Sequence, residues 1–74
     1  MKIRIIDFAW HGAQTLFVEI TIESTQGTIK GMVRILDGII YGDLVHPQKS
    51  MLSVEEIEDV KGYLTEKFNS GFFE

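Results

Sequence analysis

The chain has 74 residues, of which 45% are hydrophobic and 11% aromatic, so it fits one folded domain over residues 1–74 and is not a disordered chain. It has no cysteine, which excludes a disulfide framework, thiolate zinc sites and a cysteine nucleophile. Its net charge is −4, with seven basic and eleven acidic residues, and this balance argues against a partner recognised through its phosphates.

The N-terminus has neither the long apolar run nor the small-residue cleavage site of a signal peptide. No stretch approaches the roughly 20 apolar residues that span a membrane. Small secreted domains usually need disulfides, and the chain opens at Met1 without a tag or linker. We therefore expect a complete small gene product located in the cytoplasm, with no membrane partner.

The first predicted strand, residues 2–10, changes its apolar phase partway along. After Ile5, the apolar positions move to Ile6, Phe8 and Trp10. A single extra residue in one strand produces such a shift, so we expect a β-bulge near Ile5 and Ile6.

The second predicted strand, residues 15–25, has the clearest pattern in the chain. Its apolar side consists of Leu16, Val18, Ile20 and Ile22. Gly27 is suited to the positive φ of a two-residue primed turn, so Gln26 and Gly27 are predicted to connect this strand to residues 28–36.

That turn sets a register between the two strands. It places Ile20 opposite Val33, and it places Val18 opposite Ile35. On the other face the same register gives two opposite-charge pairs, Glu19 with Arg34 and Glu23 with Lys30.

Asp37 and Gly38 predict a second tight turn, followed by a fourth strand over residues 39–45. In this register Ile35 lies opposite Ile40. Large residues also meet small ones, since Val33 faces Gly42 and Gly31 faces Leu44. Pro47 then ends the strand, because proline cannot donate to the ladder.

A helix over residues 54–69 completes the domain. Ser53 and Glu56 form a capping box, and Leu52 with Ile57 forms a hydrophobic staple. Gly62 costs about 1 kcal/mol relative to alanine and is expected to allow close approach to the sheet. The predicted class is therefore α+β, a four-stranded antiparallel meander (β-β-β-β-α) with one C-terminal helix packed on one face.

The apolar alternation makes one sheet face the one that the helix covers. The other face and the C-terminal tail carry the candidate interaction residues, namely Phe17, Met32, Arg34, Leu36, Ile39, Tyr41, Phe72 and Phe73. An apolar group rimmed by charge is typical of a contact surface. The two tail phenylalanines are expected to dock either on their own domain or on a partner.

No set of residues predicts catalysis, a cofactor or a metal site. His11 and His46 are the only histidines, and nothing in the pattern brings them together with Asp7 or Asp43. The serines occupy linker or cap positions, and the glycines do not have the spacing of a phosphate-binding loop. We expect no enzyme activity.

Two functions remain as hypotheses. The first is a non-enzymatic protein-interaction module, a homodimer or a small regulator or inhibitor of a larger protein, a role that includes phage-encoded inhibitors of host factors. The second is a regulator that binds single-stranded nucleic acid on the same face. There Trp10, Phe17 and Tyr41 would stack bases beside Lys30 and Arg34.

The run from Val33 to Gly38, the following strand, His46-Pro47 and the capped helix resemble the stage V sporulation protein G family, small dimeric DNA-binding regulators. This resemblance implies a dimer that binds DNA. The basic character of a DNA-binding surface is absent from the chain, so we assign no family on this resemblance.

Overall fold

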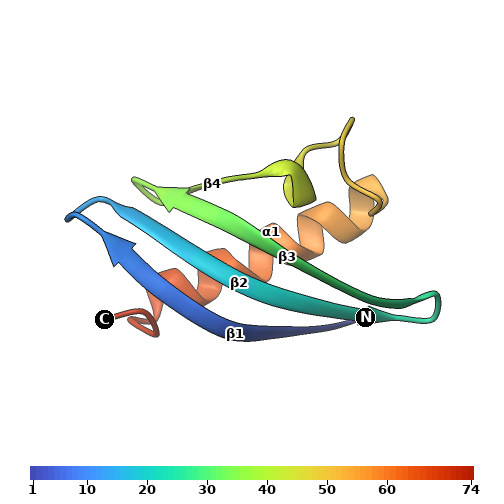
Figure 1. The fold of residues 1–74 in the computed structure, drawn as a ribbon, viewed down its shortest axis with the longest axis horizontal. Helices are drawn as coiled ribbons and strands as arrows, with labels where there is room; N and C mark the ends of the chain where they lie inside the picture. Colours follow the sequence, from blue (N-terminus) through green and yellow to red (C-terminus); the bar gives the residue numbers. More distant parts are fainter.

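A computed structural model of the chain describes residues 1–74. Its four-stranded antiparallel sheet has the order β1-β2-β3-β4, and a helix follows (Figure 1). The elements are β1 (Lys2–His11), β2 (Thr15–Ser24), β3 (Gly27–Leu36), β4 (Ile39–Tyr41), the 3-10 helix η1 (Asp43–Val45) and α1 (Val54–Asn69). The predicted α+β class and strand order are confirmed.

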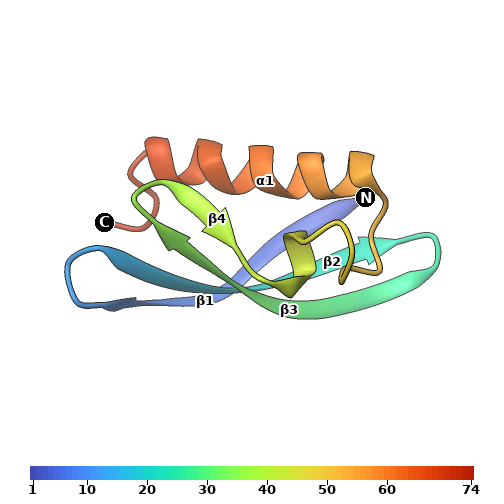
Figure 2. The same ribbon diagram turned by 90° about the horizontal axis from the view of Figure 1, so that it is seen from above.

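Helix α1 lies across one face of the sheet and leaves the other face uncovered (Figure 2). We call the covered face the inner face and the uncovered one the outer face. The helix begins where the sequence predicts, because the Ser53 hydroxyl accepts the N–H of Glu56 and the Glu56 carboxylate accepts the N–H of Ser53. These bonds satisfy N–H groups that the first helical turn leaves free.

The helix also ends where predicted. Gly71 takes a positive φ of 81°. The N–H of Phe72 then reaches back to the carbonyl oxygen of Lys67 at 3.1 Å, and the N–H of Gly71 donates to that of Phe68 at 3.3 Å. This pair of bonds is a Schellman motif, and it turns the tail back toward the sheet.

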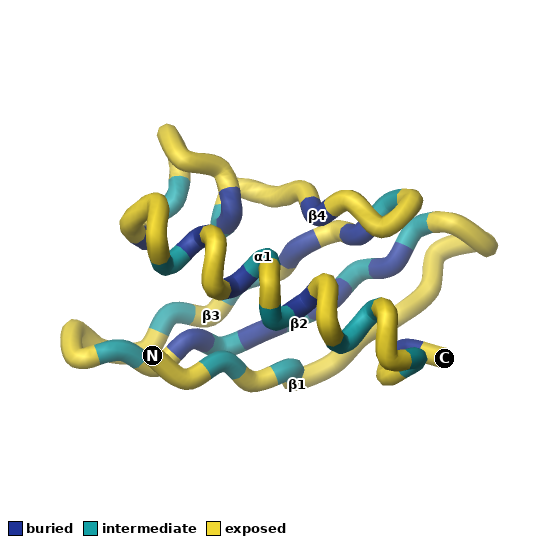
Figure 3. Tube along the Cα trace, turned by 180° about the vertical axis from the view of Figure 1, so that it is seen from behind, coloured by how far each residue is buried: buried dark blue, intermediate teal, exposed yellow.

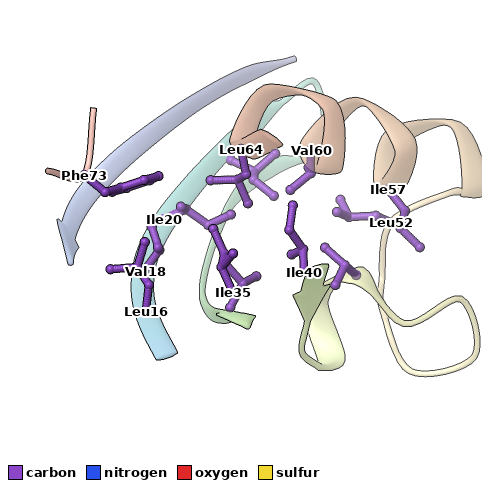
Figure 4. Close-up of a cluster of buried hydrophobic side chains, with 13 residues drawn as sticks. Leu16, Val18, Ile20, Ile35, Ile40, Leu52, Ile57, Val60, Leu64 and Phe73 are labelled. Atoms are coloured by element: carbon purple, nitrogen blue, oxygen red, sulfur yellow. The ribbon is translucent and has the colours of Figure 1, made fainter. Parts of the chain in front are cut away.

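The core lies between the inner face and α1. All 13 buried residues are hydrophobic, and no polar side chain is buried with them. Buried positions follow β2, β3 and α1, whereas β1 is exposed along most of its length (Figure 3). Figure 4 shows the cluster running from Leu52 and Ile57 at one end to Phe73 at the other.

The predicted bulge in β1 is confirmed. Ile5 pairs with Ile20, whereas Asp7 already pairs with Glu19, so Ile6 is the extra residue. The bulge moves Phe8 and Trp10 onto the inner face.

The predicted β2–β3 register is wrong by two residues. Ser24 pairs with Gly27, so the turn residues are Thr25 and Gln26 instead of Gln26 and Gly27. The Ser24 hydroxyl accepts the N–H of Gln26 and donates to the carbonyl oxygen of Gly27. These two bonds hold the turn one residue earlier in the chain than predicted. Neither turn residue has a positive φ, so this is not a primed turn, and Gly27 with φ 126° opens β3.

The predicted charge pairs are consequently wrong. Arg34 lies opposite Phe17, and Met32 lies opposite Glu19. The Lys30 ammonium reaches Glu19 at 3.5 Å instead. The predicted faces survive, because side chains alternate with a period of two and a shift by two residues keeps every side chain on its face.

The β3–β4 turn follows the prediction, with φ 53° at Asp37 and 80° at Gly38. Ile35 pairs with Ile40 as expected. The strand is shorter than the predicted 39–45, however, because Gly42 takes φ 140° and the chain then turns into η1. That turn buries Val45 in the core.

Two predicted approaches of large to small residues occur although β4 has ended. A Cβ on Gly31 would lie 3.0 Å from Leu44 Cδ2, and one on Gly42 would lie 3.5 Å from the Cα of Val33. The expected role of Gly62 is wrong, since a Cβ there would have no neighbour within 4 Å.

Candidate interaction surface

The outer face brings apolar side chains from three strands together. Phe17, Arg34 and Tyr41 form one row across β2, β3 and β4. Leu36 and Ile39 form the next row, since they pair directly. We define the outer-face cluster as its five apolar members, which are Phe17, Met32, Leu36, Ile39 and Tyr41.

Three members of the outer-face cluster are well exposed. Met32 is 57% exposed and Ile39 56%, and the ring of Tyr41 is also accessible. An open hollow of about 290 Å³ lies among Phe17, Met32 and Tyr41. Phe17 and Met32 also border a smaller hollow of about 90 Å³ beside β1. A side chain of a partner can fill either of these hollows in the apolar surface.

Charged groups lie beside the cluster. The Arg34 guanidinium sits 5.4 Å from the centre of the Tyr41 ring, in a cation–π arrangement. The two ion pairs of the chain, Lys30 with Glu19 and Lys49 with Asp43, leave Arg34 without a carboxylate partner. Arg34 is therefore free to meet an acidic group.

The structure separates the two tail phenylalanines. Phe73 is 3% exposed and packs edge-on against Phe8 with ring centres 5.0 Å apart. Phe72 is 46% exposed, and its ring lies beneath the Lys67 ammonium. Phe73 is therefore docked on its own domain, and of the two only Phe72 has surface to offer a partner.

The aromatic residues considered for base stacking do not share a face. Trp10 pairs with Leu16 on the inner side, and its indole N–H donates to the carbonyl oxygen of Phe73 at 2.8 Å. Phe17 and Tyr41 lie on the outer face.

The histidines have local roles. The His11 ring meets Phe17 edge-on with centres 6.1 Å apart. His46 Nδ1 accepts the N–H of Gln48 at 3.2 Å. No three histidine, aspartate or glutamate side chains gather in a way that could hold a metal ion.

A second exposed apolar group, which the predicted interaction surface does not include, lies along β1. Ile6, Phe8 and Trp10 are all exposed there despite their size. The sequence does indicate this group, because a four-strand meander leaves its first strand at an edge, where a bulged strand meets only one neighbour.

Comparison with protein-family models, curated proteins and solved structures found no match to this chain. Helix α1 does not have the length and apolar character needed to cross a membrane.

Proposed function

We propose that this protein is a non-enzymatic interaction module, a small regulator or inhibitor that binds a larger protein through the outer-face cluster. The observation that supports the proposal is the exposure of Met32, Ile39 and Tyr41 on one uncovered sheet face, where Met32 and Tyr41 border a hollow. Exposed apolar groups that are contiguous and rimmed by charge mark contact surfaces.

The side chains of this surface indicate which chemical groups a partner would present to it. Met32 has a flexible, polarisable side chain that adapts to an apolar group entering the hollow. Arg34 provides an unpaired cation at the same place. A partner segment with an apolar side chain next to a carboxylate fits both features.

Binding, not catalysis, suits these side chains. Apart from Arg34 and the Tyr41 hydroxyl, the groups around the larger hollow are apolar or belong to the main chain. General acid–base catalysis and covalent catalysis both need titratable or nucleophilic groups within hydrogen-bond reach of one another.

Single-stranded nucleic acid is the alternative ligand of this face. Phe17 and Tyr41, with Arg34 between them, provide two rings and one cation that could stack and neutralise a strand. The engagement of Trp10 with the tail and the pairing of Lys30 with Glu19 weaken this alternative.

The test is affinity capture of partners from extract of the producing cells, using wild type and two single variants. Met32→Glu places a charge in the cluster, whereas Val54→Glu makes the same kind of change at an exposed apolar position on α1. A specific partner should bind wild type and Val54→Glu but not Met32→Glu. Equal binding by both variants would contradict the proposal.

A second measurement distinguishes a nucleic-acid ligand from a protein ligand. Titration of mixed-sequence oligonucleotides at low and moderate salt should show no binding if the ligand is a protein. Salt-sensitive binding that Met32→Glu or Arg34→Ala abolishes would favour the nucleic-acid function instead.

A further inference from the structure

Strand β1 is an end strand and pairs only with β2. Its other edge stays open over the 10 residues of Lys2–His11 (Figure 1). The backbone groups that point off such an edge are a template for another strand, and proteins that stay monomeric protect long edges with charges or bulges.

The two halves of this edge differ in protection. Before the bulge, Lys2 and Arg4 place two cations on the strand. After the bulge, residues 7–11 contain no lysine, arginine or proline. This second half instead presents the exposed rings of Phe8 and Trp10. The centre of the Phe72 ring lies 6.1 Å from that of the Phe8 ring.

We propose that residues 7–11 of β1 pair antiparallel with the same residues of a second copy, centred on Ala9. The pairing would join two four-stranded sheets into one continuous sheet. Both α1 helices would then lie on one side, and both outer-face clusters on the other. This proposal does not depend on what the outer-face cluster binds.

The faces of β1 agree with this register. Asp7, Ala9 and His11 pair with outer-face residues of β2, whereas Phe8 and Trp10 pair with inner-face residues. Centring on Ala9 sets Asp7 opposite His11 of the second copy, and Phe8 opposite its Trp10. Each of these pairs joins side chains on the same face, and cross-strand aromatic pairs stabilise sheets.

Charge selects the second half of β1 over the first. A symmetric antiparallel pair centred on Ile3 would set Lys2 opposite Arg4 of the second copy. Centring on Arg4 would set that residue against itself. Like charges directly opposite each other destabilise a sheet, whereas residues 7–11 bring no like charges together.

One existing bond would be exchanged. The N–H of Phe8 now donates to the Asp7 carboxylate at 2.8 Å. A carbonyl oxygen of the second strand would replace that acceptor, which releases the carboxylate toward His11 of the second copy. The Trp10 indole is already bonded to Phe73, so its ring is held in place before pairing.

The absence of cysteine makes a crosslinking test specific. Residues directly opposite across a strand pair have Cβ atoms about 4.5–5.5 Å apart, so Ala9→Cys should form a disulfide dimer under mild oxidation after a small adjustment. Gln26→Cys, at the distant β2–β3 turn, is the matched control and should stay monomeric. Crosslinking of Ala9→Cys no faster than of Gln26→Cys would overturn the proposal.

Light scattering during size-exclusion chromatography over a dilution series tests the same contact without cysteine. Wild type and Gln26→Glu should reach twice the monomer mass, whereas Ala9→Glu should weaken self-association about fivefold, since it opposes two carboxylates. Met32→Glu should remain dimeric, which separates this contact from the outer-face cluster. A wild type that stays monomeric at every concentration would overturn the proposal.

Discussion

The indole N–H of Trp10 donates a hydrogen bond of 2.8 Å to the carbonyl oxygen of Phe73, a residue 63 positions away in the sequence. This bond joins β1 to the C-terminal tail. The Phe73 ring packs on Phe8, which lies on β1 with Trp10. Phe73 is also a buried member of the core cluster, at one end of it (Figure 4). The tail therefore closes one end of the core.

Removing the Phe73 ring should destabilise the domain far more than removing its neighbour. Phe73→Ala should lower the free energy of unfolding by about 3 kcal/mol, since it takes a buried aromatic ring from the core. Phe72→Ala removes a half-exposed ring and should cost about 1 kcal/mol or less. Urea denaturation followed by circular dichroism measures both. Equal losses would mean that the tail is not docked.

The Trp10 bond can be tested without changing the apolar packing much. Trp10→Phe keeps a ring but loses the donor, so it should cost about 1 kcal/mol of unfolding free energy. Tyr41→Phe removes a polar group from an exposed ring and is the control. Thermal or urea unfolding of the two variants should separate them, and matching stabilities would argue against this bond.

The capping box gives a third prediction. Ser53→Ala removes the acceptor for the N–H of Glu56 and should cost about 1 kcal/mol. Glu56→Gln keeps an acceptor for the N–H of Ser53, so it should cost less. Urea midpoints report both variants. A loss for Glu56→Gln as large as that for Ser53→Ala would show that charge at the helix start outweighs the bond geometry.

The features that the sequence predicts correctly depend on local chemistry. Ser53 and Glu56 mark the helix start because both bonds form within one turn. The Asp37–Gly38 turn has the two positive φ values that such a dipeptide favours. The sheet faces follow from apolar alternation alone, and thus survive an error in register.

The features that the sequence predicts wrongly depend on how side-chain bonds and burial compete with regular strand pairing. Ser24 bonds within its own turn, and that side-chain chemistry moves the β2–β3 register by two residues. β4 ends early where the chain turns at Gly42 and Val45 enters the core. The outer-face cluster keeps its members, yet Phe17 lies opposite Arg34, whereas the predicted register sets it opposite Leu36.

Two glycines should respond oppositely to the same substitution. Gly62→Ala, in the interior of α1 with no atom within 4 Å of the new Cβ, should stabilise the domain by about 0.5–1 kcal/mol. Gly42→Ala should destabilise it, because φ is 140° there and the new Cβ would lie 3.2 Å from the carbonyl oxygen of Met32. Thermal unfolding measures both. A destabilising Gly62→Ala would mean that α1 packs closely against other residues at this position.

The sharpest contrast lies between two adjacent residues of β3. Met32 points from the outer face into solvent, whereas Val33 is 1% exposed beneath α1. Met32→Glu should lower the free energy of unfolding by only about 1 kcal/mol or less, because it sets a second carboxylate opposite Glu19 on an exposed face. Val33→Glu should unfold the domain, because it buries a carboxylate that has no partner in an entirely hydrophobic core.

Circular dichroism and urea titration measure this contrast before any binding experiment. A folded and stable Met32→Glu variant that no longer binds a partner has lost a contact and not its fold. If Met32→Glu unfolded the domain instead, the outer face would be part of the structure that holds the domain together, and the proposed contact surface would have to be sought along β1.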